Sequence, residues 1–147
     1  MDPTILIAED DAELAELYSR YLIRCGYRVL TASGGVECLS IIRNESPMVI
    51  LASVNLPWDG TDGLLDFLSD EARYRWGPSV ILTGCTAEEN VAELREQPSV
   101  FRYLRKPFLM GRLLDCIRAI ESDGRYDGTP AMHSRQQPVE SRYVTSQ

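Results

Sequence analysis

The sequence has little that would suit a membrane, a nucleic acid or secretion. No apolar run approaches the roughly 20 residues that a membrane-spanning helix needs. Its 15 Lys and Arg against 22 Asp and Glu give a net charge of −7, which argues against the basic surface that nucleic-acid phosphates require. The N-terminus lacks the basic and apolar layout of a signal peptide. We therefore expect a cytoplasmic protein that binds neither nucleic acid nor membrane.

Residue patterns of the common enzyme and metal sites are scarce as well. The four cysteines are far apart and form no CxxC pair, so buried reduced thiols are expected, with a disulfide or metal site as the alternative. The one histidine, His133, lies near the C-terminal end, and there is no G-x-S-x-G motif, which argues against a Ser-His-Asp triad. No GxGxxG follows the first apolar run, which argues against a dinucleotide-binding domain.

One apolar run with an abrupt polar end is the strongest local signal. Residues 48–52, MVILA, are typical of a strand that is buried on both faces in a parallel sheet. Polar and turn residues follow from Ser53 to Gly63 and predict a loop over that segment. Ligands of open α/β sheets bind beyond the carboxyl ends of the strands, so Ser53 stands where chemistry is expected.

Strand and helix patterns alternate five times along the chain. Strands are predicted at residues 4–8, 27–31, 48–52, 79–83 and 101–104. Helices are predicted between residues 11 and 26, 36 and 42, 64 and 72, 88 and 96, and 109 and 124. This alternation predicts an α/β sandwich with a parallel sheet. Residues 124–147 have few aliphatic side chains and no periodicity, so we expect one domain at 1–123 and a flexible tail or linker at 124–147.

Polar side chains follow four of the predicted strands. Glu9 and Asp10 come after the first strand, Ser53 after the third, Thr83 ends the fourth, and Lys106 follows the fifth. Each has an ordinary interpretation alone; the acidic pair, for example, could simply favour a helix start. Because the carboxyl ends of parallel strands share one edge of a sheet, the five side chains together predict a pocket.

This constellation resembles the receiver domain of bacterial two-component response regulators. The resemblance covers about residues 4–122 and rests on four motifs: ILIAEDD, the LP…DG segment after the third strand, VILTG and YLRKPF. It implies a flavodoxin-like (βα)5 three-layer sandwich with a parallel sheet in the order 2-1-3-4-5. It also implies a signalling module of a phosphorelay rather than an enzyme.

The resemblance implies a role for each pocket residue. In the family an acidic pair helps to hold Mg²⁺, an Asp ending the third strand accepts a phosphoryl group, and a hydroxyl and a lysine contact that group. Glu9 and Asp10 match the acidic pair, Thr83 the hydroxyl and Lys106 the lysine. Tyr103 matches an aromatic position whose orientation often reports activation.

Ser53 departs from the family at the acceptor position. The acceptor lies four residues before the proline of the following loop, and counting back from Pro57 gives Ser53. A hydroxyl cannot accept phosphate by the carboxylate's route, and it removes one anionic Mg²⁺ ligand. The expected metal site of Glu9, Asp10 and Asn55 is therefore weak or vacant, and the resemblance is to an atypical receiver, a pseudo-receiver.

Two expectations concern Lys106. A buried ammonium without a partner is costly, so we predict that Lys106 pairs with Asp10 or hydrogen-bonds Ser53. The Lys106–Pro107 bond is a candidate cis peptide, which the family uses to aim its lysine.

Three functional hypotheses remain. The preferred one is a phosphorylation-independent module that binds a histidine kinase or a downstream effector through the fourth helix, fifth strand and fifth helix, with a homodimer as a further alternative. The second is a receiver phosphorylated at Asp59 or Asp62, in a loop two residues longer than the family's. The third is a hydrolase with Ser53 as nucleophile and Lys106 as base.

Overall fold

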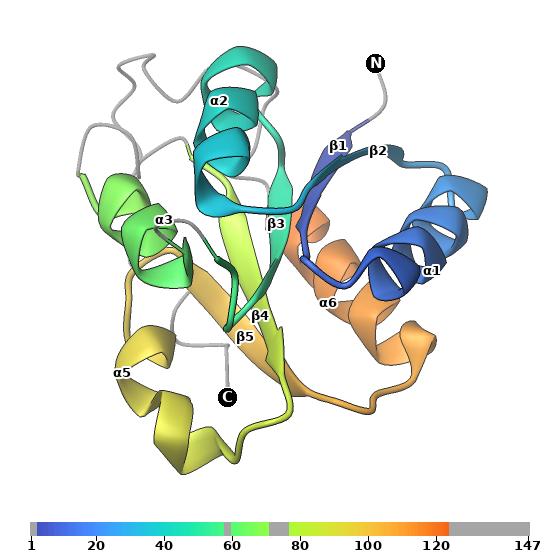
Figure 1. Cartoon of the computed structure of the whole chain (residues 1–147). Helices are drawn as coiled ribbons and strands as arrows, with labels where there is room; N and C mark the ends of the chain where they lie inside the picture. The colour runs from blue at the N-terminus through green and yellow to red at the C-terminus, as the bar shows by residue number, and fades with distance from the viewer. Residues whose placement is uncertain (1–2, 58–59, 71–76, 124–147) are drawn as a thin grey trace.

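The computed structural model describes residues 3–57, 60–70 and 77–123. Its strands form one five-stranded parallel sheet in the order β2-β1-β3-β4-β5, which confirms the predicted topology (Figure 1). The strands are β1 Thr4–Ala8, β2 Arg28–Ala32, β3 Val49–Ser53, β4 Ser79–Gly84 and β5 Val100–Arg105. The tail predicted at residues 124–147 lies outside the described residues.

Helices cover both faces of the sheet, as the three-layer prediction requires. They are α1 Ala12–Arg24, α2 Gly35–Glu45, α3 Gly60–Leu68, the 3₁₀ helix η1 Glu88–Val91, α5 Ala92–Arg95 and α6 Met110–Ser122. Helices α1 and α6 lie on one face, whereas α2, α3 and α5 lie on the other (Figure 1). In the part of the chain that the structure describes, no helix combines the length and the apolar character needed to cross a membrane.

The core consists of two apolar layers that share the central strands. Leu6, Ile50 and Leu82 point to the α2/α3 side, and their neighbours Ile5 and Leu51 point to the α1/α6 side. Successive side chains of a strand face opposite sides of the sheet, so a strand covered on both faces must be apolar throughout. The central strands β1, β3 and β4 are indeed buried along their whole length.

Helix α3 begins earlier than the sequence analysis predicted. We expected a loop up to Gly63, but the helix starts at Gly60. The Thr61 hydroxyl donates a hydrogen bond to the carbonyl of Ser53 at 2.5 Å and so ties the first turn to the end of β3. A tertiary contact of this kind overrides the low helix propensity of glycine. The helix predicted between residues 88 and 96 is divided into η1 and the single turn of α5.

Helix α1 begins and ends as its sequence predicts. The Asp11 carboxylate accepts hydrogen bonds from the backbone N–H groups of Glu13 and Leu14, at 3.0 and 3.2 Å. This pattern satisfies N–H groups that have no partner within the helix. After the helix, Gly26 adopts a φ of 100°, a left-handed conformation that glycine reaches without a steric penalty.

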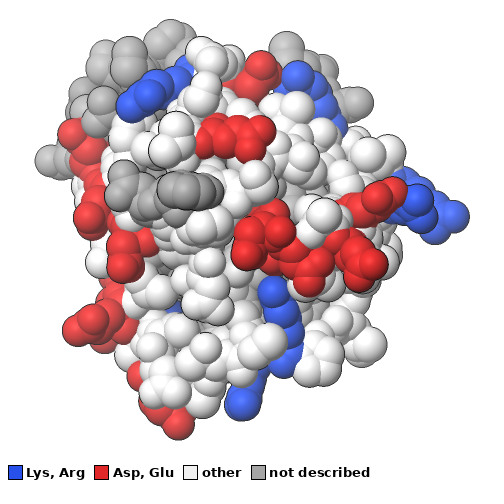
Figure 2. Space-filling view, in the orientation of Figure 1, with Lys and Arg blue, Asp and Glu red and all other residues white. Residues whose placement is uncertain are grey.

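Acidic side chains are unevenly distributed over the surface. On the face shown in Figure 2, Asp and Glu side chains gather near the N-terminal end of α1. The carboxyl edge of the sheet, where β1 leads into α1, therefore lies in an acidic part of the surface.

The Tyr27 side chain ties the end of α6 to the start of β2. Its hydroxyl donates a hydrogen bond to Glu121 Oε1 at 2.8 Å. Burial of the ring, and then the bond to Glu121, raise the pKa of Tyr27 to about 12. Burial also raises the pKa of Tyr18 on α1 to about 12, with a smaller contribution from Glu9.

These two tyrosines predict a loss of stability at alkaline pH. An unfolded tyrosine ionises near pH 10 and these two near pH 12 when folded, so between those values the unfolded chain binds fewer protons and the free energy of unfolding falls as pH rises. Tyr27→Phe keeps the ring but removes the titrating hydroxyl, so its stability should fall less steeply. Urea unfolding at about pH 9 and about pH 11 measures both slopes. Equal slopes in the two proteins would contradict this assignment.

Candidate functional site

Two hydroxyl side chains lie next to each other at the carboxyl edge of the sheet. Strands β3 and β4 pair in parallel, with Ser53 opposite Thr83. Both residues are buried, at 4% and 1% exposure. The Val54 N–H donates to the carbonyl of Thr83 at 2.8 Å and holds the two strand ends together. The structure therefore brings Ser53 and Thr83 together as the sequence predicted.

The two hydroxyls differ in their partners. Ser53 Oγ accepts a hydrogen bond from the backbone N–H of Asn55 at 3.3 Å. Thr83 Oγ1 is buried and has no hydrogen-bond partner within the described residues. A buried hydroxyl without a partner costs on the order of 1–3 kcal/mol. Thr83 therefore retains a free donor at the position that the resemblance assigns to contact with a phosphoryl group.

Lys106 pairs with Glu9, so our prediction of Asp10 or Ser53 as its partner was wrong. Lys106 Nζ lies 3.3 Å from Glu9 Oε1, and the two side chains are 18% and 3% exposed. Asp10 is exposed, so its charge is solvated, whereas the buried Glu9 carboxylate needs a counter-charge. Glu9 Oε2 also accepts the Asp11 N–H at 3.1 Å. The Glu9 carboxylate thus bridges the Lys106 ammonium group and the backbone N–H of Asp11.

The predicted metal ligands are not arranged as a dedicated metal site. Both oxygens of Glu9 already accept hydrogen bonds, and Asp10 and Asn55 are exposed. In residues 3–57, 60–70 and 77–123 no group of three or more His, Cys, Asp or Glu side chains could hold a metal ion. Mg²⁺ requires a nearly ideal octahedron of oxygen ligands. Glu9, Asp10 and Asn55 as placed therefore do not form a preassembled octahedral site among the described residues.

Tyr103 is turned into the protein. Its side chain is buried in the layer that packs against α2 and α3, and its hydroxyl donates to the carbonyl of Thr86 at 2.5 Å. Burial raises the pKa of Tyr103, while the nearby Arg105 opposes the change. The Lys106–Pro107 peptide, a candidate from the sequence, is cis.

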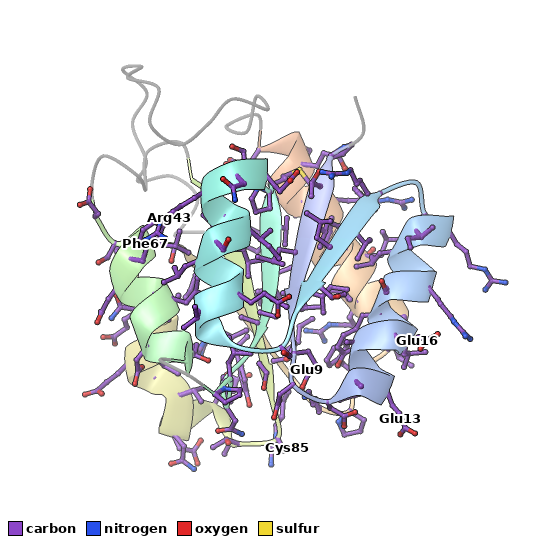
Figure 3. The ribbon with its side chains drawn as sticks, turned by 45° about the horizontal axis from the view of Figure 1, so that its top comes forward. Glu9, Glu13, Glu16, Arg43, Phe67 and Cys85 are labelled. Carbon is purple, nitrogen blue, oxygen red and sulfur yellow. The ribbon has the colours of Figure 1, made fainter. Side chains whose placement is uncertain are left out.

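Gly84 is a site residue that sequence reasoning missed. A Cβ atom at this position would lie 2.6 Å from Val54 Cγ2 and 3.2 Å from the Tyr103 hydroxyl. Glycine therefore allows Val54 and Tyr103 to close over the end of β4. The sequence feature that could have indicated its role is a glycine directly after Thr83, the predicted end of the fourth strand. Cys85 follows it and is exposed, and Figure 3 shows it at the same end of the sheet as Glu9.

The alternative phosphate acceptors are not brought into the pocket by any described contact. Asp59 lies outside the described residues. Asp62 is exposed in the first turn of α3, whereas the preceding Thr61 is buried and bonded to Ser53.

An acidic groove of about 590 Å³ adjoins the pocket between α1 and the start of α2. Its lining includes the carboxylates of Glu9, Asp10, Glu16 and Glu37, with Arg20 as the basic member. Arg20 pairs with Glu16 at 2.7 Å, so it offsets little of the remaining negative charge. The groove therefore disfavours the approach of an anion from this side.

The chain matches a protein-family model over most of its length. The family is described as the response regulator receiver domain, and the match covers residues 5–118. The match includes all five strands, except for Thr4, the first residue of β1.

Curated relatives agree with this match. The chain is 32% identical to the transcriptional regulatory protein AfsQ1 of Streptomyces coelicolor, over 86% of this chain and 55% of that protein. It is 24% identical to the polar-differentiation response regulator DivK of Brucella ovis, over 84% of this chain and 99% of DivK. The hydrogenase transcriptional regulatory protein HoxA of Cupriavidus necator is 29% identical, over 82% of this chain but only 25% of HoxA. The chain thus spans a quarter to about half of the two transcriptional regulators.

Solved structures share the fold. The receiver domain of the Francisella response regulator 1452 has a TM-score of 0.74 and 24% identity, and the match covers 83% of this chain and 98% of that one. The chemotaxis response regulator CheY4 of Vibrio cholerae has a TM-score of 0.73 and 22% identity, over 82% of this chain and 99% of CheY4. At this level of identity the likeness shows the fold alone.

The Glu9–Lys106 pair predicts coupled losses of stability. Glu9→Gln leaves the half-buried Lys106 without its counter-charge, so we expect the free energy of unfolding to fall by about 1–3 kcal/mol. Lys106→Gln should cost a similar amount, and the double variant less than the sum, because the second change removes a charge already left unpaired. Urea unfolding of the four proteins measures the coupling.

A matched control is Glu16→Gln, on the solvent side of α1 (Figure 3). Its pair with Arg20 is exposed, at 62% and 76%, so we expect a change of less than about 0.5 kcal/mol. Strictly additive losses for Glu9 and Lys106 would show that the pair does not act as a unit.

The close contacts around Gly84 predict that one added methyl group at this position destabilises the fold. Gly84→Ala forces Val54 or Tyr103 to move, so we expect a loss of about 1–3 kcal/mol and displaced NMR signals of the Tyr103 ring. In Gly111→Ala, on the exposed start of α6, the new Cβ meets nothing within 4 Å, so stability should stay within about 1 kcal/mol or rise. Equal stability of the two variants would refute the close packing at Gly84.

Proposed function

Because this chain belongs to the response regulator receiver domain family, we propose that it is a receiver-like signalling module that binds partner proteins without phosphorylation of an aspartate. The observation that carries the proposal is Ser53, which ends β3 opposite Thr83 where the family has its acceptor. A serine hydroxyl does not accept a phosphoryl group by the route that an aspartate carboxylate uses.

The charge balance of the pocket supports this proposal. Phosphoryl transfer needs positive charge near the developing anion, and the family supplies it through a lysine and a divalent cation. Here Lys106 is neutralised by Glu9 at 3.3 Å, and the adjoining groove carries further carboxylates. The donor atoms of Glu9, Asp10 and Asn55 would hold Mg²⁺ weakly, with water in place of the missing carboxylate.

The proposed partners are a histidine kinase or a downstream effector in the cytoplasm. The proposed binding face consists of η1, α5, β5 and α6, which correspond to the fourth helix, fifth strand and fifth helix of the sequence prediction. Binding through this face needs no acceptor aspartate. We propose no catalytic activity, because Lys106, the candidate base, donates to Glu9 in an ion pair, and no described basic group accepts the Ser53 hydroxyl proton.

Acetyl phosphate labelling tests the proposal. With Mg²⁺ present, the chain should acquire no phosphoryl adduct detectable by mass spectrometry, because Ser53 is not a competent acceptor. Ser53→Asp should acquire one if the remaining pocket can still support transfer, and Ser53→Asn provides the isosteric control without an acceptor. An adduct on Asp59 or Asp62 in the parent chain would overturn the proposal in favour of phosphorylation at another residue.

A further inference from the structure

A second groove, of about 350 Å³, opens beside the edge strand β5, on the proposed binding face. Strand β5 lies at the end of the sheet, with α5 and α6 on its two sides (Figure 1). Its lining includes the side chains of Glu88, Arg105, Pro107, Phe108, Leu109 and Arg112.

The groove carries positive charge in an otherwise acidic chain. Arg105 and Arg112 are both exposed, and within the described residues neither forms an ion pair. Glu88 is the one carboxylate in the lining, and it is already paired with Arg95 at 3.2 Å. The net charge of the chain is −7, so two unpaired arginines in one groove are a local reversal of sign.

The start of α6 adds to this positive potential. The N-cap residue Leu109 offers no side-chain acceptor to the first N–H groups of this 13-residue helix. Those N–H groups form the positive end of the helix dipole, and they lie at the rim of the groove beside Arg112. Two guanidinium groups and one helix start therefore favour a carboxylate ligand.

Apolar surface lies next to these charges. Leu109 is 78% exposed, Pro107 is exposed and Phe108 is half-buried. All three line the same groove, so the apolar surface there is contiguous, as in protein contact surfaces, and is not one scattered side chain.

We propose that this groove binds an acidic segment of a partner protein that also carries apolar side chains. Carboxylates of the segment pair with Arg105 and Arg112, and an apolar side chain packs on Leu109 and Pro107. The inference deepens the proposed function, since it names the chemistry of the partner for the binding face.

Charge argues against two other occupants. A second copy seated on this groove would have to supply carboxylates to Arg105 and Arg112, and the carboxylate that lines the groove itself, Glu88, is already paired with Arg95. Residues 124–147 contain three Arg but only two acidic residues, so the C-terminal part of this chain does not complement the groove either.

The test uses a fluorescein-labelled synthetic peptide of Glu and Leu residues, and a second peptide with Gln in place of every Glu. Fluorescence anisotropy is recorded at about 0.1 M salt, where charges more than about 10 Å apart are largely screened. We expect saturable binding of the Glu peptide and at least about tenfold weaker binding of the Gln peptide. Arg105→Gln combined with Arg112→Gln should weaken Glu-peptide binding about tenfold, and Leu109→Ser should weaken binding of both peptides.

The matched control is Arg20→Gln combined with Arg24→Gln, which makes the same change in net charge on exposed residues of α1. It should leave the affinity within about twofold, because those charges lie outside the groove. Circular dichroism verifies that each variant folds. Equal weakening by both double variants, or no saturable binding of the Glu peptide up to about 1 mM, would overturn the inference.

Two further outcomes separate this inference from the proposed function. Self-association that disappears in the Arg105 and Arg112 variant, measured by sedimentation, would overturn the inference in favour of a second copy as occupant. All binding is measured without a phosphate donor, so a phosphoryl adduct in the labelling experiment would overturn the proposed function while leaving peptide binding intact. If the peptide does not bind and the labelling experiment gives no phosphoryl adduct, the inference about the groove is overturned and the proposed function stands.

Discussion

The ion pair between Glu9 and Lys106 is the constraint on which the pocket depends. It joins residues 97 positions apart in the sequence, from the end of β1 to the segment after β5, across the carboxyl edge of the sheet. Both partners are largely removed from water, so each needs the other's charge. Because Ser53 brings no charge of its own, Lys106 is matched by one buried carboxylate, that of Glu9, and the exposed Asp10 adds further negative charge at the same edge.

The strands of the fold could be predicted from the sequence because a strand that is buried on both faces has a recognisable residue pattern. A strand such as β3 must be apolar throughout when helices cover both sides, and its end is marked by the change to polar residues at Ser53. The start of α3 could not be predicted, because Gly60 and Gly63 indicate a loop when only local propensity is considered. The hydrogen bond from Thr61 to the carbonyl of Ser53 fixes the helix start at Gly60, and that bond exists only once β3 and α3 are packed.

The members of the candidate site followed from the strand ends, but their pairing did not. The sequence indicated that Lys106 would need an anion; which carboxylate it meets depends on burial and reach. Glu9 is buried and has one more methylene group than an aspartate, whereas Asp10 is exposed. Gly84 was missed for a similar reason, since its importance lies in the close approach of Val54 rather than in any chemistry of its own.

The distribution of charge over the surface bears on how such a module could choose its partner. With Lys106 neutralised by Glu9, its ammonium is not available to report a phosphoryl group unless the pair first separates, and separation would leave the buried Glu9 carboxylate uncompensated. In the proposed module, selectivity therefore comes from surfaces that do not depend on a phosphoryl group. The chain has two of opposite sign: the acidic groove beside α1, and the groove with Arg105 and Arg112 beside β5. A partner that matches one of them is repelled by the other, so the same charges that attract it also fix its orientation.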